Sequence, residues 1–122
     1  MNLQTASPGN VAGLFAALSD PHRLAIFERL AAEGEKTVGE IGEPFDISGP
    51  AISRHLAVLE TAGLIERRVE KQWRVCRVRE EALMAVEDWV TRQRRFWNAS
   101  FDRLARHLEN QEEKKDGSAR KR

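Results

Sequence analysis

Ser53 and Arg54 lie in a segment whose residue spacing is that of a helix with one buried and one polar face. Apolar residues recur in it at helical spacing and predict the buried stripe: Ile52, Leu56 and Leu59. The residues left to face outward are small or polar: Ser48, Gly49, Ser53, Arg54 and Ala57. An arginine in this position can donate two hydrogen bonds to a guanine edge, and short hydroxyls can bond to phosphates or base edges. Small residues let the helix approach its ligand closely.

Each of these residues also has a plainer explanation. Ser48 is well placed to be only the N-cap of the helix, since serine is a preferred residue there. Ser53 and Arg54 could form an ordinary solvated helix face. His55 adjoins the buried stripe, and we expect it to pack or to contact a phosphate rather than to bind a metal.

A second group of charged side chains lies between Glu66 and Arg79. Two acidic residues, Glu66 and Glu70, oppose six basic ones: Arg67, Arg68, Lys71, Arg74, Arg77 and Arg79. The formal net charge of the whole chain is +1, which neither supports nor excludes nucleic-acid binding. A locally basic segment is a candidate phosphate-facing surface, although a solvated hairpin explains it equally well.

Capping signals predict the helices that position these residues. Asn10, Asp20 before a proline, and Ser48 are each placed as N-caps, and Thr37 with Glu40 forms a capping box ahead of a short helix. That short helix and the one after Ser48 are joined by a very short turn. The sequence therefore predicts a helix-turn-helix in which the second helix carries Arg54.

Residues 64–79 change character and predict a β-hairpin, because they are β-leaning and partly alternating. A long helix is predicted from Glu80 to about Glu109, roughly 45 Å in length. Its apolar stripe, which bears Trp89, Trp97 and Phe101, is longer than so small a domain can cover and needs a partner. The predicted fold is mainly α with a small β-hairpin wing, a winged helix-turn-helix.

Three segments resemble the ArsR-type (arsenic-repressor) family of winged-helix regulators. Ser48-Gly-Pro-Ala-Ile-Ser-Arg-His-Leu-Ala-Val-Leu-Glu-Thr-Ala-Gly-Leu-Ile65 is similar to the family's recognition helix. Leu18-Ser-Asp-Pro-His-Arg-Leu24 resembles the opening of its second helix, and the pattern from Trp89 to Leu108 resembles the long terminal helix of one branch. The resemblance extends over about residues 11–109.

The resemblance implies a homodimer that binds double-stranded DNA at an inverted repeat, usually in its own promoter, and represses by occlusion. It implies that DNA is contacted by the recognition helix and the wing: Ser48, Ser53, Arg54, His55, Arg68, Lys71 and Arg74. Gly49 is also a candidate DNA-binding residue. The family often has a longer side chain at this position, so the glycine removes one DNA contact. Dimerisation is expected through the first and last helices: Leu14, Val86, Val90, Trp97, Phe101, Leu104 and Leu108.

Metal sensing is a weaker interpretation. Family members that bind thiophilic metals carry a Cys-x-Cys-type pair on the third helix, where this chain has residues 37–41 without cysteine. The long helix holds Asp88, Asp102 and His107 but lacks the Asp-x-His and second histidine that other members use. We therefore expect no metal site and no cofactor, and the sequence identifies no small-molecule effector.

Cys76 and the tryptophans have alternative interpretations. Arg74 and Arg77 could lower the pKa of Cys76 and make it a redox switch, but a partly buried hairpin residue is favoured. The three tryptophans could line a small-molecule pocket, but core and dimer-interface positions are favoured: Trp73, Trp89 and Trp97.

Length and composition set the remaining bounds. The 122 residues predict one DNA-binding and dimerisation domain over residues 1–109, followed by a polar, disordered tail over residues 110–122. Without a membrane-spanning stretch, a secretory signal or a cysteine pair, the chain is expected in the cytoplasm. Neither a glycine-rich phosphate loop nor a nucleophile elbow is present, so we do not expect the chain to be an enzyme. A winged helix that serves only protein contacts is the other alternative, and the basic hairpin argues against it.

Overall fold

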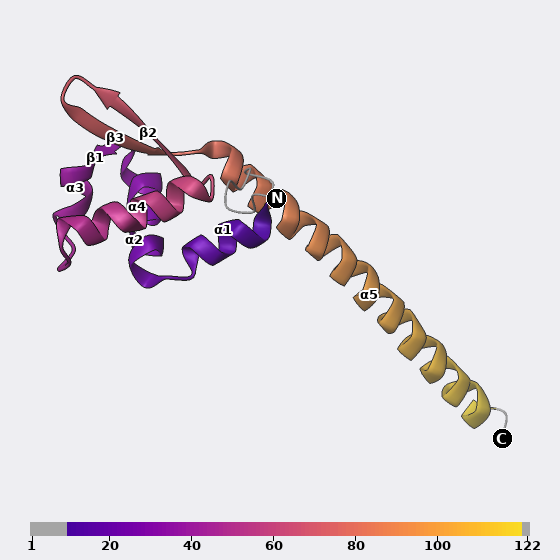
Figure 1. Cartoon of the computed structure of the whole chain (residues 1–122). Helices are drawn as coiled ribbons and strands as arrows, with labels where there is room; N and C mark the ends of the chain where they lie inside the picture. Colours follow the sequence, from indigo (N-terminus) through magenta and orange to yellow (C-terminus); the bar gives the residue numbers. More distant parts are fainter. Residues whose placement is uncertain (1–9, 121–122) are drawn as a thin grey trace. The chain divides into compact units, whose positions relative to one another are not determined.

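The computed structural model describes residues 10–120 and the side chains as far as Glu113. It divides into two compact units, Met1–Glu87 and Asp88–Arg122, which are described separately. The elements in chain order are α1 (Val11–Leu18), α2 (Pro21–Glu33), β1 (Lys36–Thr37), α3 (Val38–Gly42), α4 (Gly49–Thr61), β2 (Ile65–Glu70), β3 (Trp73–Val78) and α5 (Glu80–Arg120) (Figure 1).

The predicted caps begin the first four helices. The side chains of Asn10, Asp20 and Ser48 accept hydrogen bonds from backbone N–H groups in the first turns of α1, α2 and α4. Thr37 and Glu40 form a reciprocal capping box at α3, so that both orphan donors are satisfied. The helix starts are therefore fixed by local chemistry that the sequence displays.

The first unit contains a three-stranded antiparallel sheet in the order β1-β3-β2. Strand β1 pairs through Lys36 with Cys76 and through Thr37 with Val75. The sequence predicts only the β2–β3 hairpin, because a two-residue strand is too short to show alternation. The turn of the hairpin projects away from the helices of this unit (Figure 1).

A single apolar cluster holds the first unit together, and residues from helices and strands contribute to it. Its fully buried large side chains are Leu14, Ile26, Ile41, Ile52, Leu56, Leu59, Leu64, Ile65 and Cys76. The stripe predicted for α4 is thus confirmed as the face that packs inward, which leaves the opposite face of α4 in solvent.

Helix α5 continues to Arg120, beyond the end predicted near Glu109. Residues 110–113 are Asn, Gln, Glu and Glu, and glutamine and glutamate have high helix propensity, so polar composition alone did not predict the helix end. Of the residues predicted as a disordered tail, 110–120 are therefore helical, whereas 121–122 lie outside the described residues. Among the described residues, no helix is both long and apolar enough to cross a membrane.

Candidate nucleic-acid interface

The outward face of α4 carries the side chains predicted to read DNA. Ser53 and Arg54 are both exposed, on the side opposite the buried residue Ile52. Within the part of the chain that the structure describes, Arg54 has no hydrogen-bond or ion-pair partner. Its five guanidinium N–H donors are thus available to an external acceptor.

The N-terminus of α4 has an N-cap hydrogen bond and is sterically accessible at Gly49. The Ser48 hydroxyl accepts a hydrogen bond from the Ala51 N–H at 3.2 Å, which confirms its role as N-cap without excluding a further contact. A Cβ built at Gly49 would meet nothing within 4 Å. The glycine therefore leaves the first turn of α4 sterically open, and no packing reason requires it there.

His55 is half-buried and lies beside the first turn of α2. Its Nδ1 is 3.9 Å from Oδ2 of Asp20, and its ring stacks on that of His22 with centroids 5.6 Å apart. The backbone N–H of Arg23 is the main cause that lowers the pKa of the Asp20 carboxyl, with smaller contributions from His55 and others, while partial burial opposes them. The predicted packing of His55 is confirmed, but the sequence does not indicate that His22 and Asp20 are its neighbours.

Most basic residues of the wing already have acidic partners. Arg68 donates to both oxygens of Glu35, at 2.7 and 2.8 Å, and also to Glu70 at 3.0 Å. The remaining pairs join Arg67 to Glu60, Arg77 to Glu66 and Arg79 to Glu81. The hydrogen bond from Arg68 is the main cause that lowers the pKa of the Glu35 carboxyl. Arg68 is the predicted DNA contact that the structure supports least.

Lys71 and Arg74 are the wing cations that remain available. Both are exposed, and neither has an ion-pair or hydrogen-bond partner among the described residues. Lys71 occupies the two-residue turn between Glu70 and Trp73, where its φ of 57° lies in the left-handed region. Arg74 pairs in register with Val69 on β2. The free positive charge of the hairpin is thus concentrated near its turn.

Two apolar side chains accompany these cations. Val69 and Trp73 are 74% and 54% exposed, which is unusual for residues of their size. The favoured interpretation of Trp73 as a core or dimer-interface residue does not fit its position beside the wing turn. Apolar and polar residues alternate too irregularly along the hairpin sequence to show that Trp73 faces outward.

Cys76 lies in the core on β3 and has no exposed surface. Burial is the main cause that raises the pKa of its thiol, partly offset by the nearby Arg67. A raised pKa disfavours the reactive thiolate. The buried-residue interpretation is thereby favoured over the redox switch.

The residues predicted for dimerisation divide into two groups. Leu14 has no exposed surface and packs in the core of its own chain, so it offers no surface to a second copy and that assignment is corrected. Val86 also packs, partly buried, against this core. Val90 is partly buried, and the other four predicted residues have exposed fractions from 52% to 59%: Trp97, Phe101, Leu104 and Leu108.

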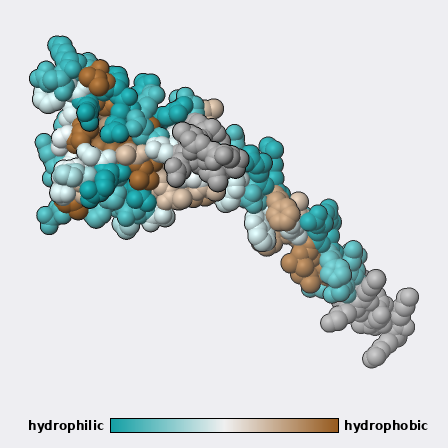
Figure 2. All heavy atoms as spheres, viewed as in Figure 1, coloured by the Kyte–Doolittle hydropathy of each residue, from teal (hydrophilic) through white to brown (hydrophobic). Residues whose placement is uncertain are grey.

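The second unit, described by itself, is the helical segment beyond Glu87. The rings of Trp97 and Phe101 pack on each other at 5.8 Å, one turn apart. Together with Leu104 and Leu108 they are spaced by four, three and four residues, which is the spacing of a coiled-coil seam. Figure 2 shows apolar surface beside polar surface along this helix.

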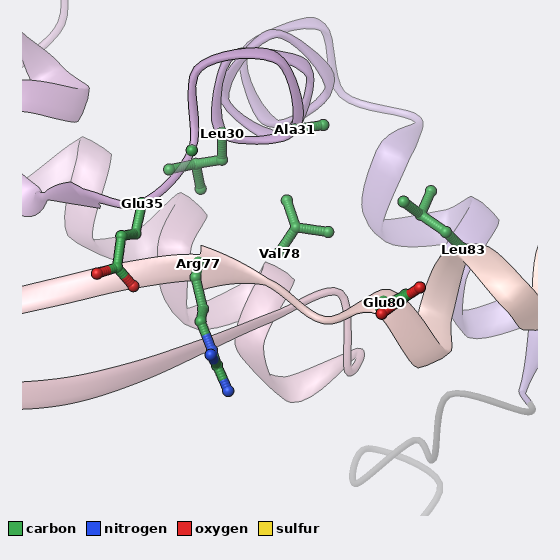
Figure 3. Close-up of a pocket in the computed structure, with 8 residues that line it drawn as sticks. Leu30, Ala31, Glu35, Arg77, Val78, Glu80 and Leu83 are labelled. Atoms are coloured by element: carbon green, nitrogen blue, oxygen red, sulfur yellow. The ribbon is translucent and has the colours of Figure 1, made fainter.

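A shallow pocket of about 300 Å³ lies in the first unit between α2, the end of β3 and the first turns of α5. Figure 3 shows Leu30, Ala31, Val78 and Leu83 around it, with Arg77 and Glu80 at its edge. It is widely open to solvent and has few polar groups to orient a ligand, unlike specific small-molecule sites. We therefore assign no effector to it.

Comparison with known proteins finds helix-turn-helix transcriptional regulators among the similar sequences. The family model described as a helix-turn-helix domain matches residues 18–68, from the end of α1 into β2. The HTH-type transcriptional regulator Rv2034 of Mycobacterium tuberculosis is 37% identical over 95 residues, covering 78% of this chain and 85% of that protein. The arsenical resistance operon repressor of Escherichia coli is 42% identical over 60 residues, covering 49% and 51%.

Solved structures extend the similarity to the fold. A crystal structure of an ArsR family transcriptional regulator has a TM-score of 0.67 and 35% identity, covering 77% of this chain and 96% of that one. The homodimeric winged helix-turn-helix DNA-binding domain from Mycobacterium bovis, described as a possible ArsR-family regulator, has a TM-score of 0.55 and 27% identity, covering 70% and 81%.

Proposed function

Because the chain belongs to the ArsR family of winged helix-turn-helix transcriptional regulators, we propose that it binds an inverted-repeat operator as a homodimer and represses transcription there. The observation that carries this proposal is the exposed guanidinium of Arg54 on the outward face of α4, which has no partner among the described residues. It lies on the helix that such folds insert into the major groove.

In the proposed complex, each recognition helix reads one half-site. Arg54 contacts a guanine, and His55 contacts the sugar-phosphate backbone of the DNA. Ser53 and the first turn of α4 contact phosphates or base edges. Lys71 and Arg74 bind phosphates from the wing. Arg68 contributes only after it leaves Glu35 and Glu70, so its contribution is the smallest.

Dimerisation is assigned to the exposed seam of the second unit. Large apolar side chains in a continuous stripe are costly in water and are usually covered by a partner. A second copy of the same helix has the matching spacing, since a heptad seam pairs with itself. The homodimeric relative from Mycobacterium bovis supports a partner of this kind. We place the functional domain within residues 1–109, although α5 continues further.

Repression follows from the size of such a complex, because a dimer over two half-sites blocks access to a promoter. The family supports a role in the cytoplasm, where the operator lies, and gives no reason to expect catalysis by this chain.

Selection of binding sites from random double-stranded DNA tests this function directly. The proposal predicts an inverted repeat with half-site centres about one helical turn, ~34–36 Å, apart. Recovery of a single, non-repeated motif would contradict the dimeric arrangement. If no sequence is enriched by the selection, the result would contradict sequence-specific binding and favour a winged helix that contacts protein.

A further inference from the structure

We propose that Asp20, His22 and His55 form a binding site for a divalent metal ion of the zinc type, between the first turn of α2 and the recognition helix α4. One ligand atom from each side chain lies within 4.8 Å of the other two. The residues come from two helices and are far apart in sequence, so the fold itself brings them together.

The donor set suits zinc. Imidazole nitrogens and a carboxylate oxygen are common zinc ligands, and three protein ligands leave a fourth position for water. Zinc bonds of about 2.0–2.1 Å require ligand atoms about 3.3 Å apart, so the ligand atoms must approach one another by at most about 1.5 Å. His22 lies in the first turn of its helix and is not part of the buried apolar cluster, so it can make this adjustment without disturbing the core.

Local contacts already orient the three groups. Oδ2 of Asp20 accepts the backbone N–H groups of His22 and Arg23, at 2.9 and 3.1 Å, which fixes the carboxylate. The stacked rings of His22 and His55 are inclined by only 26°, and the ring of Phe45 flanks His22 edge-on at 6.2 Å. The Asp20 carboxylate is held in this way and loses little further freedom when it coordinates an ion, which leaves the adjustment to the His22 side chain.

Zinc binding by the full chain without DNA tests the site, measured by equilibrium dialysis with elemental analysis. The wild type should bind one zinc ion per chain. His22→Gln and Asp20→Asn should each lose about tenfold or more in affinity, and asparagine preserves the cap of α2. His107→Gln is the matched control, because it removes the third histidine of the chain, on α5, and should change nothing.

Imidazole ¹⁵N resonances provide a second readout, since the chain has only three histidines. Zinc should shift the resonances of His22 and His55 and leave those of His107 unchanged. Equal zinc affinity in the wild type and His22→Gln, or shifts confined to His107, would overturn the site.

Discussion

The arginines of this chain differ in what already occupies their guanidinium groups. Arg54 has no partner among the described residues, whereas Arg68 is held by Glu35 and Glu70. The sequence shows both as basic residues in DNA-facing segments and cannot separate them, because Glu35 is 33 positions away from Arg68. For the same reason, the sequence does not indicate which residues lie next to His55. Residue types at helical spacing were predictable, and pairings across the fold were not.

At this scale the thiol of Cys76 gives a first prediction. Since burial raises its pKa and leaves no exposed surface, the native chain should be inert to an alkylating reagent at neutral pH. Mass spectrometry should find one alkylated cysteine only after unfolding in denaturant. Rapid modification of the native chain would contradict the buried position and revive the redox interpretation.

Ser48 gives a second prediction, because capping and DNA contact can be separated there. Ser48→Ala should lower the free energy of unfolding by about 0.5–2 kcal/mol, since the cap at the Ala51 N–H is lost. Ser48→Asp should retain the cap and the stability, but its negative charge should repel phosphates and reduce operator affinity. Urea denaturation and fluorescence anisotropy measure the two effects. Wild-type operator affinity in Ser48→Asp would mean that the N-terminus of α4 does not face DNA.

At the scale of elements, boundaries set by local chemistry were predictable. The caps at Asp20 and Ser48 and the capping box at Thr37 all begin helices where the sequence places them. The two-residue strand β1 depends on pairing with β3 and has no local signal. Helix α5 ends beyond the predicted residue because a polar sequence can still be a good helix former.

The hairpin turn yields a prediction of its own. Lys71→Gly should leave the fold intact or slightly stabilised, because glycine adopts the φ of 57° without strain. Binding should weaken for all DNA sequences alike, and the slope of log affinity against log salt should flatten by about 1, as for one lost phosphate contact. Lys71→Arg, which keeps the charge, is the matched control. An unchanged salt slope in Lys71→Gly would remove the wing turn from the interface.

For the whole molecule, the predicted winged helix-turn-helix is confirmed, and the chain divides into two compact units. The first unit holds the proposed DNA-reading face, and the second holds the exposed seam. Leu14 marks the limit of prediction at this scale. Its helical spacing indicates that it is apolar and inward-facing, but only the packed fold shows that it faces the core of its own chain.

The seam should determine the oligomeric state. Leu104→Asp places a charge in the apolar stripe and should convert dimers to monomers, with a marked loss of operator affinity because the two half-sites are no longer bound together. Arg106→Asp, a charge change outside the seam positions, is the control and should remain dimeric. Sedimentation equilibrium measures the mass. A monomeric Leu104→Asp with wild-type operator affinity would refute the dimeric mechanism.

The central claim is that α4 reads DNA through Arg54, and base preference measures it most directly. Fluorescence anisotropy should compare the selected operator with variants at each guanine, for the wild type, Arg54→Ala and the control Arg106→Ala. We expect Arg54→Ala to lose about 1–3 kcal/mol on the operator and its preference at one guanine per half-site, while Arg106→Ala retains both. Unchanged affinity and preference in Arg54→Ala would contradict the account.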